Sequence, residues 1–272
     1  MTDIRITKND IITKLRELGL KCGDNIIAHS SLSSFGYVEG GADTVIDALT
    51  ELLTDNGTLV MPSFNHGSVY YGESRTGDTG IFDVKTTPTS NGVIADTFWR
   101  RPGVLRSMNP THSFAAWGKN AARYTARHHL VDSFGKDSPV GMLWQDGGQC
   151  LFLGVGYSAN TFHHFVETHT DAPCISKRGE AYPVRFADGR EETIHTWGWR
   201  ERDCPITDSA RYAGLMADYH RQINIGAAAV TLYPLRVGYQ IISKCLSEGI
   251  DGFPPCSACS NRPRKTVWTI PV

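Results

Sequence analysis

The first 64 residues alternate between amphipathic helical segments and short apolar runs. Residues 7–19 carry apolar side chains at the spacing of one helix face, with Thr7 as the predicted N-cap and Gly19 as the predicted end. A second helical segment with the same spacing covers residues 45–53. Apolar runs typical of buried strands occur at 25–28, 58–64 and 150–156. This alternation predicts an α/β fold built in layers.

The composition is that of a globular protein with a substantial core. Of 272 residues, 40% are hydrophobic and 20% are charged, and the net charge of -1 indicates neither a nucleic-acid nor a membrane partner. The seven cysteines are odd in number and scattered, which does not indicate a disulfide framework. The chain also lacks a basic start followed by an apolar run. We therefore expect a cytoplasmic protein.

Residues 160–169 concentrate three histidines and a glutamate directly after an apolar run. If Thr161 caps a helix here, His164 and Glu167 stand three residues apart on one face, where the carboxylate can orient the imidazole as a general base. His163 is turned about 100° from His164, so at most one of them faces a substrate. A surface helix with no chemical role is the alternative.

Two further segments are polar and too long for simple connections. Residues 65–92 are rich in glycine and predict a substrate loop, with a flexible insertion as the alternative. Residues 170–210 contain Trp197 and Trp199 beside arginines and predict a second substrate-side insertion. Of the remaining histidines, we expect His112 to be buried and structural. We expect surface positions for His128, His129 and His220.

Several motifs together resemble the antibiotic N-acetyltransferases that modify the 3-amino group of aminoglycosides. They occur in family order between residue 5 and about residue 250. They are 29–32 (His-Ser-Ser-Leu), 36–41 (Gly-x-Val-Glu-Gly-Gly), 57–64 (Gly-Thr-Leu-Val-Met-Pro-Ser-Phe), 106–110 (Arg-Ser-x-x-Pro), 137–140 (Asp-Ser-Pro-Val), 151–154 (Leu-Phe-Leu-Gly) and 161–167 (Thr-x-x-His-x-x-Glu). The chain is identified as a member of this family on these motifs.

The resemblance implies a layered α/β/α sandwich with a central mixed β-sheet, distinct from the fold of the commoner acetyltransferase superfamily. It also implies direct acetyl transfer from acetyl-coenzyme A to a primary amine. The catalytic histidine of the family matches His164, and the glutamate that orients it matches Glu167. For coenzyme A we expect contacts from Ser30, Ser31, Leu32, Arg106, Ser107 and Ser138, with Arg106 next to a phosphate.

The amine acceptor is less well defined by the sequence than the reaction. Aminoglycosides are polycations, so acidic side chains are expected in the acceptor site. We expect the acceptor to contact Glu39, Asp83, Asp171, Trp197 and Trp199. A biosynthetic enzyme acting on a nucleotide-linked or polysaccharide amino sugar is the alternative, because the tryptophans and arginines suit an anionic acceptor equally well.

A metal-dependent hydrolase is a further alternative, with ligands drawn from His164, Glu167, His169 and His29. The spacing fits neither of the usual zinc helices, so we expect no metal. We predict one α/β domain over residues 1–250, with 65–92 and 170–210 as substrate-side insertions. A tail, 251–272, carries Cys256 and Cys259, whose role the sequence leaves open. A homodimer is an additional expectation.

Overall fold

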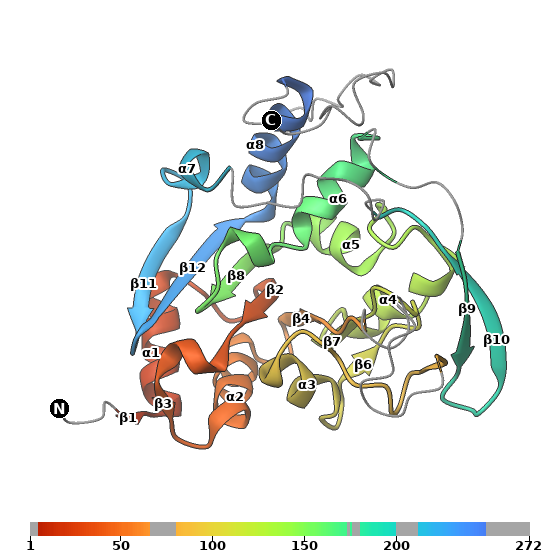
Figure 1. Ribbon diagram of the computed structural model, residues 1–272. Coiled ribbons are helices and arrows are strands. Elements are labelled where there is room, and N and C mark those ends of the chain that lie inside the picture. Colours follow the sequence, from red (N-terminus) through yellow and green to blue (C-terminus); the bar gives the residue numbers. More distant parts are fainter. Residues whose placement is uncertain (1–4, 66–79, 173–174, 176–179, 200–211, 249–272) are drawn as a thin grey trace.

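The computed structural model of the chain (Figure 1) describes residues 5–65, 80–172, 175, 180–199 and 212–248. Its strands are β1 (Arg5–Ile6), β2 (Asn25–Ser30), β3 (Tyr37–Val38), β4 (Thr58–Pro62), β5 (Phe82–Asp83), β6 (Leu105–Arg106), β7 (Phe114–Gly118), β8 (Gln149–Leu153), β9 (Glu180–Arg185), β10 (Glu191–Thr196), β11 (Arg221–Ile225) and β12 (Ala228–Pro234). Its α-helices are α1 (Lys8–Leu18), α2 (Gly41–Leu53), α3 (Val93–Trp99), α4 (Ala121–Thr125), α5 (Pro139–Gln145), α6 (Phe162–His169), α7 (Ala213–Met216) and α8 (Leu235–Glu248).

The centre of the molecule is a mixed sheet of seven strands in the order β11-β12-β8-β2-β4-β7-β6. Strand β2 lies in the middle and runs parallel to both of its neighbours, β4 and β8. The outer strands are antiparallel to those they pair with. The predicted central mixed sheet is therefore confirmed.

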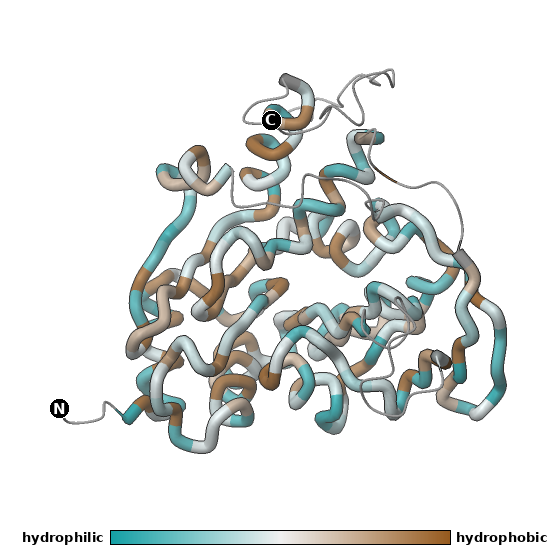
Figure 2. The backbone as a smooth tube through the Cα atoms, viewed as in Figure 1, coloured by the Kyte–Doolittle hydropathy of each residue, from teal (hydrophilic) through white to brown (hydrophobic). Residues whose placement is uncertain are grey.

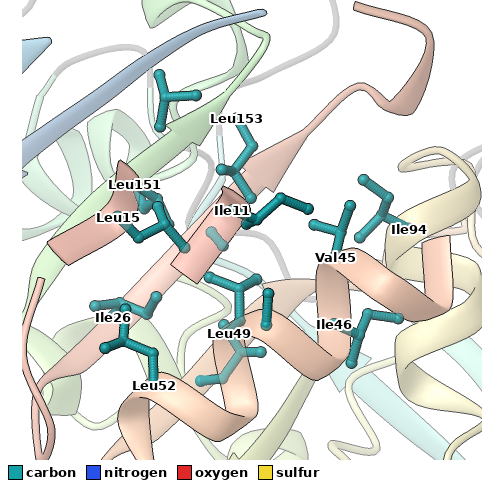
Figure 3. Packing of buried hydrophobic residues seen from close by; sticks show 14 of the residues in the cluster. Ile11, Leu15, Ile26, Val45, Ile46, Leu49, Leu52, Ile94, Leu151 and Leu153 are labelled. Atoms are coloured by element: carbon teal, nitrogen blue, oxygen red, sulfur yellow. The ribbon is translucent and has the colours of Figure 1, made fainter. Parts of the chain in front are cut away.

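Helices cover both faces of this sheet. Successive residues of a strand point to opposite sides, so the apolar side chains of the central strands need a covering layer on each face. On β2, Ile26 belongs to the hydrophobic cluster with α1, α2 and α3, whereas Ile27 belongs to the cluster with α4, α5, α6 and α8. Figure 3 shows the first cluster, with Leu15 and Leu49 packed beside Ile26. Figure 2 shows alternating hydrophobic and hydrophilic stretches along α8. The predicted α/β/α sandwich is confirmed.

The predicted first helix begins and ends as its sequence indicates. Thr7 and Asp10 form a capping box, in which each side chain binds the backbone N–H of the other residue. Gly19 ends the helix with φ 98°, the left-handed conformation that glycine adopts without a Cβ clash. The buried face of α1 is the apolar face that the sequence predicted: Ile11, Ile12, Leu15 and Leu18.

A second sheet, in the order β10-β9-β5, joins the two segments predicted as separate insertions. Strand β5, from the segment 65–92, pairs in parallel with β9, from the segment 170–210, and β9 forms a hairpin with β10. Its buried side has a small core: Phe82, Tyr182, Val184, Phe186 and Ile194. The rest of the predicted loop, 66–79, and the tail 251–272 lie outside the described residues. None of the described helices is both long and apolar enough to cross a membrane.

Candidate active site

The carboxyl ends of β2, β4 and β8 meet at one edge of the central sheet, because these three strands are parallel. The chain leaves β2 toward α2 on one face of the sheet, and it leaves β8 toward α6 on the other face. Such a divergence is the place where open α/β sheets bind ligands. The loop after β2 and the helix α6 therefore lie on either side of the expected site (Figure 1).

Helix α6 carries a pair formed by His164 and Glu167. Nδ1 of His164 lies 2.9 Å from Oε2 of Glu167, three residues along the helix. The side chain of Glu167 is fully buried, whereas that of His164 is 33% exposed. An N–H at Nδ1 that donates to the carboxylate leaves the lone pair of the ring on Nε2, the arrangement of an oriented general base.

Glu167 also contacts a second histidine. Its Oε1 lies 3.0 Å from Nε2 of His163, whose side chain is only 1% exposed. Burial by itself would raise the pKa of Glu167, but the two histidines outweigh it and hold this pKa well below its usual value. The carboxylate is therefore ionised throughout the neutral pH range. His163 points inward, so His164 is the histidine with access to solvent.

The start of α6 is anchored to β2 by His29. Nε2 of His29 accepts the backbone N–H of Thr161 at 3.2 Å and lies 2.9 Å from the Thr161 hydroxyl. Thr161 is the N-cap residue of α6, as predicted, but its hydroxyl binds His29 and makes no cap hydrogen bond. Oδ1 of Asn160 accepts the N–H of Phe162 instead. The central strand thus fixes the helix that carries His164.

His29 gives the folded protein a pH dependence. Burial lowers the pKa of His29 to about 3, against about 6.5 in an unfolded chain. The unfolded state therefore binds a proton below pH ~6.5 that the folded state does not, so stability falls with decreasing pH. Between pH 7 and pH 5 His29 alone is expected to cost about 2 kcal/mol of unfolding free energy. His29→Gln, which keeps an acceptor for Thr161, should remove this part of the pH dependence of stability.

Urea unfolding at pH 5, 6 and 7 measures the effect. The matched control is His195→Gln, because His195 is exposed on β10. The lowered pKa of Glu167 affects stability at lower pH. Its contribution to the unfolding free energy is present above pH ~4.5 and is lost below it, outside the range from pH ~5 to ~7. A His29→Gln variant whose stability falls between pH 7 and 5 as steeply as that of the wild type would contradict the assignment.

A cluster of aromatic side chains adjoins His164. The ring of Phe134 lies 5.2 Å from it, and the ring of His112 lies 5.0 Å from Phe134 and 5.3 Å from Trp199. His112 is buried, as predicted, and so is Trp199. Trp197 donates its indole N–H to Asp132, which ties the segment after β10 to the loop before α5.

Comparison with known proteins identifies the family of the chain. The family model described as aminoglycoside 3-N-acetyltransferase matches residues 27–247, which include the loop after β2 and all of α6. The chain belongs to the aminoglycoside 3-N-acetyltransferase family. The predicted family is thereby confirmed, and the class of enzyme is that of the N-acyltransferases.

Two curated relatives and one solved structure illustrate the similarity. The aminoglycoside N(3')-acetyltransferase-like protein YokD of Bacillus subtilis is 35% identical over 64% of this chain and 69% of its own length. Aminoglycoside N(3)-acetyltransferase VII of Streptomyces paromomycinus is 34% identical over 63% of this chain, and this alignment spans only 64% of that enzyme. The structure of AAC-IIIb in a binary complex with CoASH superimposes with a TM-score of 0.79 at 25% identity, covering 90% and 98% of the two chains.

Within this family fold, three predicted coenzyme A residues lie together. Ser30, Ser31 and Leu32 follow one another at the end of β2, and all three are partly exposed. The Ser31 hydroxyl contacts those of Ser33 and Ser34, at 3.2 and 3.0 Å. The loop therefore presents a cluster of hydroxyl groups at the sheet edge, next to the start of α6.

The other three predicted coenzyme A residues have structural partners. Arg106 donates to the backbone oxygens of Ser63 and Thr87, and its guanidinium lies 4.4 Å from the centre of the Trp99 ring. Burial lowers the pKa of Arg106 to about 9. These contacts hold the guanidinium against the fold, and Arg106 is only partly buried, so its contact with a coenzyme A phosphate stays a prediction.

Ser107 and Ser138 are both fully buried. The Ser107 hydroxyl contacts Nδ1 of His128 at 2.8 Å and accepts the backbone N–H of Phe114. His128 is itself fully buried, so its predicted surface position is wrong. Ser138 caps α5 by accepting the N–H of Gly141. Since neither hydroxyl is exposed, we leave both serines out of the proposed cofactor site.

The structure does not bring the predicted acceptor acids together. Glu39 directly follows β3 and forms an ion pair with Arg5, and β3 lies far from α6 in Figure 1. Asp83 in β5 forms an ion pair with Arg185 at 3.3 Å. Asp171, with φ 53°, belongs to the left-handed turn that ends α6. Of the three, only Asp171 lies beside the helix that carries His164.

The described residues contain no group of three or more His, Cys, Asp or Glu side chains that could hold a metal ion. Two histidines named in the hydrolase alternative have other contacts: His29 binds Thr161, and His169 lies 5.6 Å from the Trp144 ring. Three of the seven cysteines are described: Cys22, which is exposed, and Cys150 and Cys245, which are buried. The pair Cys256 and Cys259 lies outside the described residues.

Several residues of the site were not predicted. His29 belongs to a family motif and to the metal alternative, but its role as the anchor of α6 was not predicted, and neither was any role for Phe134 or Tyr212. His163 was placed correctly on a different side of the helix from His164, but its contact with Glu167 was missed. The spacing of four residues between His163 and Glu167 was the available signal, because side chains at i and i+4 meet on a helix.

Proposed function

We propose that the chain transfers the acetyl group of acetyl-coenzyme A to a primary amine of an aminoglycoside or a related amino sugar. The observation that carries this proposal is the contact of partly exposed His164 with fully buried Glu167 at 2.9 Å. The names of the relatives support the reaction, and the CoASH complex of AAC-IIIb supports the donor. The aligned region spans only 64% of the Streptomyces enzyme, so the acceptor is inferred from the chemistry of the site as well.

The chemistry requires a base, because an amine near neutral pH is largely protonated and not nucleophilic. Nε2 of His164 takes a proton from the amine as the amine nitrogen attacks the thioester carbon. The C–N bond forms, the C–S bond breaks, and the thiolate of coenzyme A leaves with the proton that His164 returns. Glu167 keeps the proton of the neutral ring on Nδ1 and stabilises the imidazolium that forms.

The oxyanion of the tetrahedral intermediate needs donors at the end of β2. The backbone N–H of Ser31 donates to the oxygen of Leu153 at 2.9 Å, so it serves the sheet and not the oxyanion. We assign this role to the hydroxyls of Ser30 and Ser31 and to the backbone N–H of Leu32. The same three residues form the proposed cofactor loop, which places the thioester between this loop and His164.

Gly154 provides a test of the cofactor loop. Its φ of 71° is left-handed, and a Cβ there would lie 2.5 Å from Cβ of Ser34 and 3.2 Å from the oxygen of Ser31. Gly154→Ala must therefore displace the loop, and we expect the KM for acetyl-coenzyme A to rise at least ~10-fold with a loss of about 1–3 kcal/mol in stability. Steady-state kinetics and urea unfolding measure both effects.

Gly156→Ala is the matched control, because Gly156 has φ -112° and a Cβ there meets nothing within 4 Å. Its KM and stability should match those of the wild type. Equal KM values in the two variants would remove the loop from the cofactor site.

The acceptor remains open between two classes. Among the described residues, Glu39 and Asp83 are engaged in ion pairs, and the ring of Phe134 lies 5.2 Å from that of His164. Because these two predicted acceptor acids are already paired, we keep an amino sugar with a single amine, including a nucleotide-linked one, as a second candidate acceptor alongside the polycationic aminoglycosides.

Thiol release from acetyl-coenzyme A tests the proposal. The purified chain is assayed with aminoglycosides, free amino sugars and nucleotide-linked amino sugars. Acetylation of an aminoglycoside at its 3-amino group is the expected result, and release with nucleotide-linked sugars alone would move the chain to the biosynthetic alternative. No release with any amine would contradict the proposed function. Light scattering on the same preparation tests the predicted homodimer.

A further inference from the structure

Both carboxylate oxygens of Glu167 contact histidines of its own helix. Oε2 lies 2.9 Å from Nδ1 of His164, and Oε1 lies 3.0 Å from Nε2 of His163. The three side chains differ in exposure: His164 is 33% exposed, whereas His163 and Glu167 are buried. Of the two rings, only that of His164 has access to a substrate, so His163 requires a different explanation.

The ring of His163 is held in place from outside α6. It stacks on Tyr212, just before α7, with ring centres 5.6 Å apart and an angle of 2° between the planes. The Tyr212 hydroxyl accepts a hydrogen bond from Nδ2 of Asn160 at 2.6 Å, and Oδ1 of Asn160 accepts the N–H of Phe162 at the start of α6. The orientation of His163 toward Glu167 is thus set by the helix start and by the segment before α7.

We propose that His163 is a positioning residue for acetyl transfer: its Nε2–H donates to Oε1 of Glu167, so that Oε2 faces His164 and the carboxylate stays ionised while His164 is neutral. The inference deepens the proposed function and rests on it, because it concerns the state in which His164 accepts the proton of the amine. A buried carboxylate oxygen without a donor would be costly, and His163 supplies that donor.

The proposal has a definite sign for the pH dependence. The active state has neutral His164 beside ionised Glu167, and a donor at Oε1 stabilises this state over the one in which the pair holds an extra proton. Loss of the donor should therefore let the pair take up a proton at higher pH. The other titratable groups that the described residues place around α6 include His29 at its start, Tyr212 before α7, His112 beyond Phe134, and, near His169, Tyr239 of α8 and Lys136 before α5.

Two substitutions separate the donor from the ring. His163→Phe keeps a flat ring for Tyr212 but removes the N–H, and His163→Gln keeps an N–H at the position of Nε2 but removes the ring. For His163→Phe we expect the acidic limb of kcat/KM to move up by about one to two pH units. For His163→Gln we expect it to stay near that of the wild type. If the Phe variant does not fold, the smaller donor-free substitution His163→Leu takes its place.

An acidic limb that is unchanged in the donor-free variant, or shifted equally in both variants, would overturn the proposal. The second result would assign the effect to packing against Tyr212. NMR titration of the His164 Cε1–H signal measures the same proton uptake without turnover. If the wild type acetylates no amine but the donor-free variant shifts this titration, the proposed function fails while the role of His163 toward Glu167 stands.

Discussion

Replacement of His164 by alanine is expected to lower kcat for acetyl transfer by about two to four orders of magnitude. The side chain removed is the one proposed to take the proton of the amine, while its partner Glu167 and the loop 30–32 remain. The Kd for coenzyme A, measured by calorimetry, should therefore stay within about twofold of the wild-type value. Added imidazole should restore part of the rate, since it can enter the space that the ring has left.

The matched control is His195→Ala, which removes an exposed histidine from β10 and should leave kcat unchanged. Melting curves of both variants show whether the fold is retained. A His164→Ala variant with more than about one tenth of the wild-type kcat would exclude His164 as the base, because general base catalysis contributes at least ~100-fold.

The second large effect is expected for Glu167→Gln. A neutral amide of similar shape no longer stabilises the imidazolium of His164 and can favour the wrong tautomer, so kcat should fall about 10²–10⁴-fold. Without the carboxylate, His164 takes up a proton at lower pH, so the acidic limb of the pH profile should move down. This direction is opposite to the one expected for His163→Phe, which makes the two variants informative together.

Glu192→Gln on β10 is the control for the charge change, because Glu192 forms an exposed ion pair with Arg190. Its activity and pH profile should match those of the wild type. A Glu167→Gln variant with a normal profile and normal kcat would remove the carboxylate from the mechanism. Stability must be measured in parallel, because the variant replaces the buried carboxylate that contacts both His163 and His164 with a neutral amide.

The elements that could be predicted from the sequence depend on neighbours in the chain. Helix α1 is the best case, since its capping box and its terminal glycine both act within four residues of where they stand. The apolar runs of β2, β4 and β8 were likewise visible, because strands buried on both faces are continuously hydrophobic. The His164–Glu167 contact belongs to the same class, as it spans one helical turn.

What could not be predicted depends on contacts between distant segments. Strand β5 pairs with β9 about 100 residues later in the chain, and nothing local marks that partner. The burial of Ser107 has the same origin, because its hydroxyl meets His128 from another element. His29 reaches Thr161 across 132 positions, so its role as an anchor became visible only when β2 and α6 were placed together.

The end of strand β2 constrains how an enzyme of this kind can change its substrate. The last residues of this strand supply both the anchor of α6, through His29, and the proposed cofactor loop that begins at Ser30. Under the proposed function, the spacing between base and acetyl donor is then set by a paired strand at the middle of the sheet. Under the proposed function, substitutions in the predicted substrate-side segments 65–92 and 170–210 should alter which amine reaches His164 without altering that spacing. Acceptor preference and acetyl transfer can therefore be engineered as nearly independent traits.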